Sequence, residues 1–207
     1  MLKLEEAFAA AKIIPLVTLD DADDAVPMAK ALMAGGLNVL EVTLRTPASL
    51  AALEKIAKVD GAIVGAGTVL SAADVESASE AGAQFLISPG FRGRLARAAA
   101  DARLPFLPGV ATATEIMRAR DVGLSLLKFF PAEAAGGAKS VKAFAGPFPG
   151  VRFCPTGGVD AGNARDYLNL PNVVCVGGSW MTPRDAIAAK DWAKITALAK
   201  AAKEAVA

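Results

Sequence analysis

The sequence predicts a single (β/α)8 TIM barrel with parallel strands, and three observations carry this prediction. Short apolar segments recur eight times along 207 residues, most of them β-branched or aromatic and ending near Gly, Pro or Thr. Alanine-rich stretches with apolar residues at helical spacing lie between most of these segments. Strands separated by helices pair in parallel, and eight such units fit a small barrel. A doubly wound open sheet is the alternative that the same pattern allows.

The elements follow from this alternation in chain order. An N-terminal helix is expected within residues 1–12, before the first strand. Strands are expected at residues 13–19, 39–44, 62–69, 85–88, 105–110, 126–130, 152–155 and 173–176. Among the intervening helices, the amphipathic pattern is clear at residues 23–34, 73–81 and 95–102.

Helix boundaries are marked by capping signals. Ser71 stands three residues before Asp74, and Thr112 three residues before Glu115, the spacing of a capping box. Glycines at 35 and 82 stand where two helices are expected to stop. The segment after residue 131 is a glycine-rich loop with a short helix, and it carries no linker or charge block. We therefore expect residues 1–207 to form one domain.

Composition narrows the classes of function. The net charge of +1 gives no electrostatic reason to expect nucleic acid or an anionic membrane as a partner. The longest uncharged stretch, residues 167–183, contains two prolines and a glycine pair, so it is no spanning helix. The N-terminus has acidic residues early and lacks a signal-peptide layout. Cys154 and Cys175 lie in apolar runs and are expected to be reduced core residues of a cytoplasmic protein.

The second predicted strand carries charge on one face. In VLEVTLR, Glu41, Thr43 and Arg45 share one parity of the strand. In a barrel, the strand ends at the carboxyl side build the active site. A carboxylate and a guanidinium on the lining face are costly unless they are paired or chemically active. The segment therefore predicts either a reactive carboxylate or an internal ion pair that ties strands together.

The sixth predicted strand carries an amine that could likewise be either reactive or part of an ion pair. In LLKFFP, Lys128 shares its parity with Leu126 and Phe130 inside an otherwise apolar run. Burial disfavours the charged form of lysine, and a neutral amine is a nucleophile that forms Schiff bases with carbonyl compounds. The alternatives are a lysine that extends to the barrel mouth and one that simply pairs with Glu41.

The last two predicted strands end in glycine pairs. Thr156, Gly157 and Gly158 follow one strand, and Gly178 and Ser179 end the other. Paired glycines let backbone amides approach an anion, a following helix start would add its dipole, and these two loops form the usual phosphate site of the fold. Tight strand-to-helix turns without a ligand are the alternative. For two further residues, Thr68 and Pro89, the sequence supports a purely structural role and a ligand-binding role equally well.

Taken together, these motifs resemble the aldolases of 2-keto-3-deoxy-6-phosphogluconate (KDPG) and 4-hydroxy-2-oxoglutarate (KHG). The resemblance rests on VLEVTLRT, IVGAGTVL, ISPG, LKFFPAE, RFCPTGG and VGGSW, in this order. It covers residues 13–180, and VPMAKALMAGG near the start also fits. It implies a (β/α)8 barrel, a class I mechanism with no metal and no cofactor, a homotrimer, and a phosphorylated keto acid of the Entner–Doudoroff pathway as substrate.

The resemblance also implies roles for single residues. Lys128 would form the Schiff base and Glu41 would be the general acid and base. Arg45, with Thr68 and Pro89, would frame the pyruvyl end of the substrate, and Phe130 would pack beside the imine. The phosphate end would be lined by Thr156, Gly157, Gly158, Gly178 and Ser179. The FRGRL segment after ISPG departs from the family pattern, and we expect no catalytic effect from it.

Three other functions stay open at this point. The same chemistry on the galactonate epimer differs at one hydroxyl, which motifs at strand ends do not resolve. A phosphosugar isomerase or epimerase would use Glu41 and would not need an imine on Lys128. A binding barrel without catalysis would bind phosphometabolites with neither turnover nor imine. Histidine is absent, so a metal site built on histidine ligands cannot be assembled from this chain.

Overall fold

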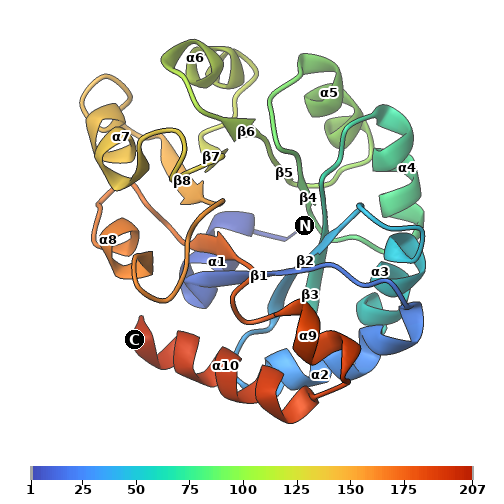
Figure 1. The fold of residues 1–207 in the computed structure, drawn as a ribbon. Helices are drawn as coiled ribbons and strands as arrows, with labels where there is room; N and C mark the ends of the chain where they lie inside the picture. Colours follow the sequence, from blue (N-terminus) through green and yellow to red (C-terminus); the bar gives the residue numbers. More distant parts are fainter. Residues whose placement is uncertain (1, 207) are drawn as a thin grey trace.

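The computed structural model describes residues 2–206, and strands lie at its centre with helices around them (Figure 1). The longest helix, α10, has 14 residues, and none within residues 2–206 has the length and apolar character needed to cross a membrane. The strands are β1 (Ile13–Val17), β2 (Val39–Thr43), β3 (Ile63–Gly67), β4 (Leu86–Ile87), β5 (Phe106–Leu107), β6 (Gly109–Val110), β7 (Leu126–Phe129), β8 (Arg152–Pro155) and β9 (Val176–Gly178). The helices are α1 (Leu4–Ala11), α2 (Ala25–Ala34), preceded by the 3-10 turn η1 (Ala22–Asp24), α3 (Ser49–Ala57), α4 (Ala72–Glu80), α5 (Gly93–Asp101), α6 (Ala113–Asp121), α7 (Gly137–Phe144), α8 (Ala164–Leu168), α9 (Arg184–Ala188) and α10 (Trp192–Ala205).

The strands form two parallel sheets. Six of them pair in the order β5-β4-β3-β2-β1-β9, and the other three in the order β6-β7-β8. Every pairing between these strands is parallel, which confirms the predicted parallel α/β class. Isolated bridges join Phe153 to Val173 and Thr156 to Gly177, alongside the gap between β8 and β9.

Two of the predicted strands differ from the structure. The expected strand over residues 105–110 is interrupted at Pro108, which has no N–H to donate, so that β5 pairs in one sheet and β6 in the other. The expected last strand over residues 173–176 instead begins at Val176 and runs to Gly178. Its glycine pair therefore belongs to the strand itself, where the prediction placed a turn.

The predicted helix boundaries follow the capping signals. Ser71 and Thr112 both complete a capping box, with Asp74 and Glu115 as the reciprocal partners. Gly35 is the C-cap of α2, and Gly82 directly follows the cap of α4 with a φ of +86°. Short polar side chains in the sequence therefore locate the two helix starts without help from tertiary packing.

Helix α1 lies across the amino ends of the strands and closes that end of the interior. Leu4, Phe8 and Ala11 pack with strand residues in an apolar cluster separate from the larger layer between strands and outer helices. Phe8 meets Phe85 edge to face, with ring centroids 5.3 Å apart. The cluster leaves only the carboxyl ends of the strands for polar chemistry.

Candidate active site

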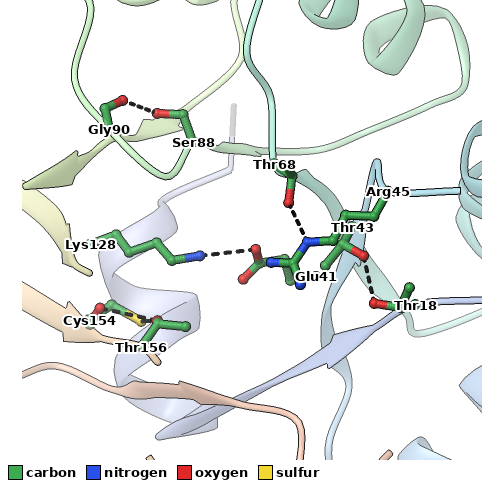
Figure 2. Close-up of polar contacts among 10 residues, drawn as sticks. All are labelled: Thr18, Glu41, Thr43, Arg45, Thr68, Ser88, Gly90, Lys128, Cys154 and Thr156. Atoms are coloured by element: carbon green, nitrogen blue, oxygen red, sulfur yellow. Dashed lines mark hydrogen bonds and ion pairs between the residues drawn. The ribbon is translucent and has the colours of Figure 1, made fainter. Parts of the chain in front are cut away.

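Lys128 and Glu41 meet inside the molecule, although they lie 87 positions apart in the sequence. Lys128 Nζ donates a hydrogen bond to Glu41 Oε1 at 3.2 Å, and the two side chains are 4% and 2% exposed (Figure 2). Lys128 extends from β7 and Glu41 from β2, so the pair connects the two sheets. The inward face predicted for Glu41 is confirmed, and for Lys128 the structure shows the pairing with Glu41 that the sequence left open as one alternative. A buried amine within reach of one carboxylate can exchange a proton with it.

The space for Glu41 is made by a glycine on the neighbouring strand. In the β2–β3 register, Thr43 lies opposite Gly67. A Cβ added to Gly67 would lie 2.1 Å from Glu41 Oε1 and 2.6 Å from its Cγ, which is closer than atoms can approach. Any side chain at this position would displace the carboxylate from its observed place.

Arg45 lies at the mouth above the buried pair. It follows β2 and is exposed, and its Nε donates to Thr68 Oγ1 at 3.1 Å (Figure 2). Thr68 holds this position with a φ of +61°, a strained conformation for a β-branched residue. Beneath them, the hydroxyls of Thr18 and Thr43 lie 2.7 Å apart. The strand period correctly placed Thr43 on the same face as Glu41. Nothing in the sequence indicated that Thr18 would join this site or that Thr68 would have a positive φ.

Pro89 and Phe130 both lie in the neighbourhood of Lys128. Pro89 follows β4, and Gly109 of β6 approaches it so closely that an added Cβ would lie 2.1 Å from the Pro89 carbonyl oxygen. Gly109 is in register with Lys128, so Pro89 belongs to the same neighbourhood. The Phe130 ring centroid is 5.4 Å from Lys128 Nζ, within the range of a cation–π contact.

The two glycine pairs lie side by side, as the isolated bridge between Thr156 and Gly177 shows. Gly157 and Gly158 form a turn after β8 with φ values of +97° and +78°. Gly178 ends β9, and the exposed Ser179 follows it. The expectation of a helix start directly after each pair is wrong, because α8 begins only at Ala164 and α9 at Arg184. Each is five residues long, so backbone amides of the turns are the donors to consider.

A groove of about 320 Å³ opens between the carboxyl ends of β1, β2 and β9. Its lining includes Arg45 on one side and Ser179 on the other, with Thr18 between them. The groove therefore connects two residues with different predicted partners. Arg45 is expected to bind the substrate carboxylate, and Ser179 is expected to bind the substrate phosphate. The full lining consists of Leu16, Thr18, Arg45, Thr46, Ser179, Thr182, Pro183 and Arg184.

The two cysteines lie close to the buried ion pair. Cys154 of β8 is in register with Lys128, and both Cys154 and Cys175 are free and buried, as predicted. Burial raises the pKa of the Cys175 thiol well above its ordinary value, and contact with Cys154 adds to this. Cys175 thus stays a neutral thiol close to the ionisable pair. Their proximity to each other was invisible in the sequence, where 20 residues separate them.

Within residues 2–206, the His, Cys, Asp and Glu side chains form no group of three that could hold a metal ion. The polar groups that meet at the strand ends are instead an amine, a carboxylate, a guanidinium and hydroxyls. This set can form an imine, move a proton and bind two anionic groups.

Known proteins share both the sequence and the fold. The family of KDPG and KHG aldolases matches residues 4–198. The KHG/KDPG aldolase of Escherichia coli K12 is 51% identical over 201 residues, covering 97% of this chain and 94% of that protein. A crystal structure of the Zymomonas mobilis KDPG aldolase with 3-phosphoglycerate superposes with a TM-score of 0.93 at 48% identity, covering 97% and 95% of the two chains.

A second solved structure bears on the chemistry. It is the KDPG aldolase of Legionella pneumophila, with pyruvate captured at low pH as a covalent carbinolamine intermediate. Its TM-score is 0.93 at 46% identity, and the superposition covers 97% of this chain and 98% of that one. A carbinolamine is the adduct that precedes a Schiff base. On these grounds, the chain belongs to the family of KDPG and KHG aldolases.

Proposed function

We propose that this protein is a class I aldolase that cleaves 2-keto-3-deoxy-6-phosphogluconate to pyruvate and glyceraldehyde 3-phosphate. One observation carries the proposal: Lys128 Nζ on β7 and Glu41 Oε1 on β2 lie 3.2 Å apart, and both side chains are buried. An isomerase would use Glu41 for proton transfer and would not need an imine on Lys128, and a binding barrel would show neither turnover nor an imine. The E. coli relative is named for KHG as well as KDPG, so we also expect cleavage of 4-hydroxy-2-oxoglutarate to pyruvate and glyoxylate.

The proposed reaction begins at the amine. Glu41 takes a proton from Lys128, whose neutral nitrogen attacks the C2 ketone of the substrate to give a carbinolamine. Glu41 returns this proton to the carbinolamine hydroxyl, which leaves as water, and the protonated imine that remains draws electrons from the C3–C4 bond. Glu41, through a water molecule, accepts the proton of the C4 hydroxyl while that bond breaks. Glyceraldehyde 3-phosphate leaves, Glu41 returns a proton to C3 of the enamine, and hydrolysis of the imine frees pyruvate.

The two ends of the substrate have different partners in this proposal. Arg45 binds the C1 carboxylate, since its planar guanidinium matches two oxygens, and Thr68 holds that guanidinium at 3.1 Å. Pro89 and Phe130 bound the pyruvyl fragment. The phosphate lies against the turn of residues 156–158 and against Gly178 and Ser179. The groove from Arg45 to Ser179 supports this orientation.

The architecture around the site is proposed to be a complete (β/α)8 barrel formed by residues 1–207 as one domain. Two features support closure: β5 and β6 are separated only by Pro108, and isolated bridges connect the neighbourhoods of β8 and β9. The homotrimer and the cytoplasmic location are proposed on the family resemblance. They affect neither the residues nor the steps assigned above.

Borohydride reduction in the presence of pyruvate, followed by peptide mass spectrometry, tests the proposal. We expect one pyruvyl adduct, on Lys128. Cleavage of KDPG is measured in parallel by coupling pyruvate to lactate dehydrogenase. A folded protein that forms no adduct would refute the imine mechanism. In that case, cleavage would favour another aldolase class, and no cleavage would favour the isomerase or the binding barrel.

A further inference from the structure

The turn of residues 156–158 is held in place through its carbonyl oxygens. Three successive carbonyls accept hydrogen bonds from groups outside the turn. Two of the donors are the backbone amides of Ala132 and Glu133, with N–O distances of 2.8 and 3.0 Å. The third is the side chain of Asn163, whose Nδ2 lies 2.9 Å from the carbonyl oxygen of Gly158. Asn163 is thus the one side chain among these three donors.

Fixing these carbonyls also fixes the amides that follow them. A peptide unit is planar and trans, so its N–H points opposite to its C=O. No acceptor within residues 2–206 takes a hydrogen bond from the amides of Gly158 or Val159. Successive amides in such a turn form a concave anion site. Asn163, by holding the Gly158 carbonyl, directs the Val159 amide to the other side of the turn.

Asn163 is itself held rigidly by its neighbours. Its Oδ1 accepts from the backbone amide of Asp160 at 2.9 Å, which leaves Nδ2 to face Gly158. In return, Asp160 Oδ1 accepts from the amides of Gly162 and Asn163, at 2.8 and 3.2 Å. The side chain therefore needs no rearrangement when a ligand arrives, as a preorganised donor site requires.

The turn has a second support, from Glu133 and Tyr167. Tyr167 is buried, and its hydroxyl donates a hydrogen bond to Glu133 Oε1. The side chain of Glu133 lies close under Gly158, where an added Cβ would come within 2.7 Å of Glu133 Cβ and Cγ. Tyr167 therefore holds the residue whose amide supports the Gly157 carbonyl.

We propose that Asn163 is a positioning residue that aims the backbone amides of this turn at the substrate phosphate, and so sets the preference for phosphorylated over unphosphorylated keto acids. This inference rests on the proposed aldolase function, which places the phosphate at the turn. Asn163 acts through the backbone and touches no reacting atom. Its loss should weaken phosphate binding and leave the chemistry at Lys128 intact.

The test compares two substrates in two variants. Asn163→Ala removes the donor to Gly158. Asn169→Ala is the matched control, because Asn169 is exposed and lies at the other end of the same helix, as the C-cap of α8. For KDPG, we expect Asn163→Ala to lower kcat/KM about tenfold, mainly through KM, the scale of one hydrogen bond to a charged group. For 2-keto-3-deoxygluconate, which lacks the phosphate, the change should stay below about twofold, and Asn169→Ala should change neither.

A second measurement uses inorganic phosphate as the probe. Phosphate should inhibit cleavage of KDPG competitively in the wild-type enzyme, with an inhibition constant that Asn163→Ala raises about tenfold. Equal losses on both substrates would overturn the inference in favour of a purely structural role, and so would no loss on either. Asn163→Ser, which keeps a hydroxyl acceptor for the Asp160 amide, gives the same test if the alanine variant fails to fold.

Borohydride trapping separates this inference from the function beneath it. If the wild-type protein forms no pyruvyl adduct, the aldolase proposal fails first. If the wild-type protein and Asn163→Ala both form the adduct on Lys128, and the two substrates are affected alike, only the role of Asn163 is refuted.

Discussion

Lys128 and Glu41 form the one ion pair within residues 2–206 in which both side chains are buried, at 4% and 2% exposure. In the other ion pairs at least one partner is more than 40% exposed. Exposed pairs contribute little to stability, and a buried pair costs desolvation that its attraction does not always offset. The location of this pair is therefore better explained by chemistry than by stability.

Replacing the amine should remove the covalent step. In Lys128→Ala, no side-chain nitrogen remains to attack the ketone, so we expect no pyruvyl adduct and no measurable cleavage. Lys142→Ala, which removes an exposed lysine of α7, is the control and should behave as wild type. Near-normal turnover in Lys128→Ala would show that the reaction proceeds without this imine.

Replacing the carboxylate should separate imine formation from proton transfer. Glu41→Gln keeps the shape of the side chain and loses the base. We expect the pyruvyl adduct still to form under borohydride, while exchange of the pyruvate methyl protons with deuterium slows by roughly 10²–10⁴-fold. Proton NMR of pyruvate in D₂O measures this exchange directly. An unchanged exchange rate would assign the proton transfer to another group.

A methyl group at Gly67 should displace the base. The added Cβ would lie 2.1 Å from Glu41 Oε1, so Gly67→Ala should lower kcat at least tenfold and destabilise the fold by about 1–3 kcal/mol through overpacking. Gly93→Ala is the matched control, since an added Cβ there meets nothing within 4 Å. Urea unfolding and steady-state cleavage assays measure the two effects. Wild-type kcat in Gly67→Ala would mean that the position of Glu41 is not critical.

The buried thiol of Cys175 should make the free energy of unfolding decrease at alkaline pH. The folded state raises the pKa of Cys175 well above its ordinary value of 9.0, so the unfolded chain loses the thiol proton first. The stabilising contribution is complete below pH 9.0 and declines above it, by about 1.4 kcal/mol per pH unit for one proton. Cys175→Ala should flatten this alkaline slope, as urea unfolding at pH 8, 9 and 10 would show. An identical slope in wild type and variant would contradict the effect.

The sequence contains much of the site because parity and motif spacing are local properties. Glu41 and Lys128 could be placed on inward faces from the two-residue period of their strands. The contact of Gly67 with Glu41 could not be predicted, since it depends on the register of β2 against β3. Two differences in the strands could not be predicted either: the interruption at Pro108 and the late start of β9. Both occur where the two sheets meet, and this tertiary arrangement outweighs local β propensity.

Helix α1 also has a consequence for the path of the reactants. Because Phe8 and its neighbours fill the amino end of the interior, substrate and both products must pass through the same opening. In the proposed binding mode, the fragment bound to Lys128 lies deeper than the phosphorylated aldehyde, which lies nearer the opening. We therefore expect an ordered release in which the aldehyde departs first, and in which added glyceraldehyde 3-phosphate slows the escape of pyruvate by blocking its way out.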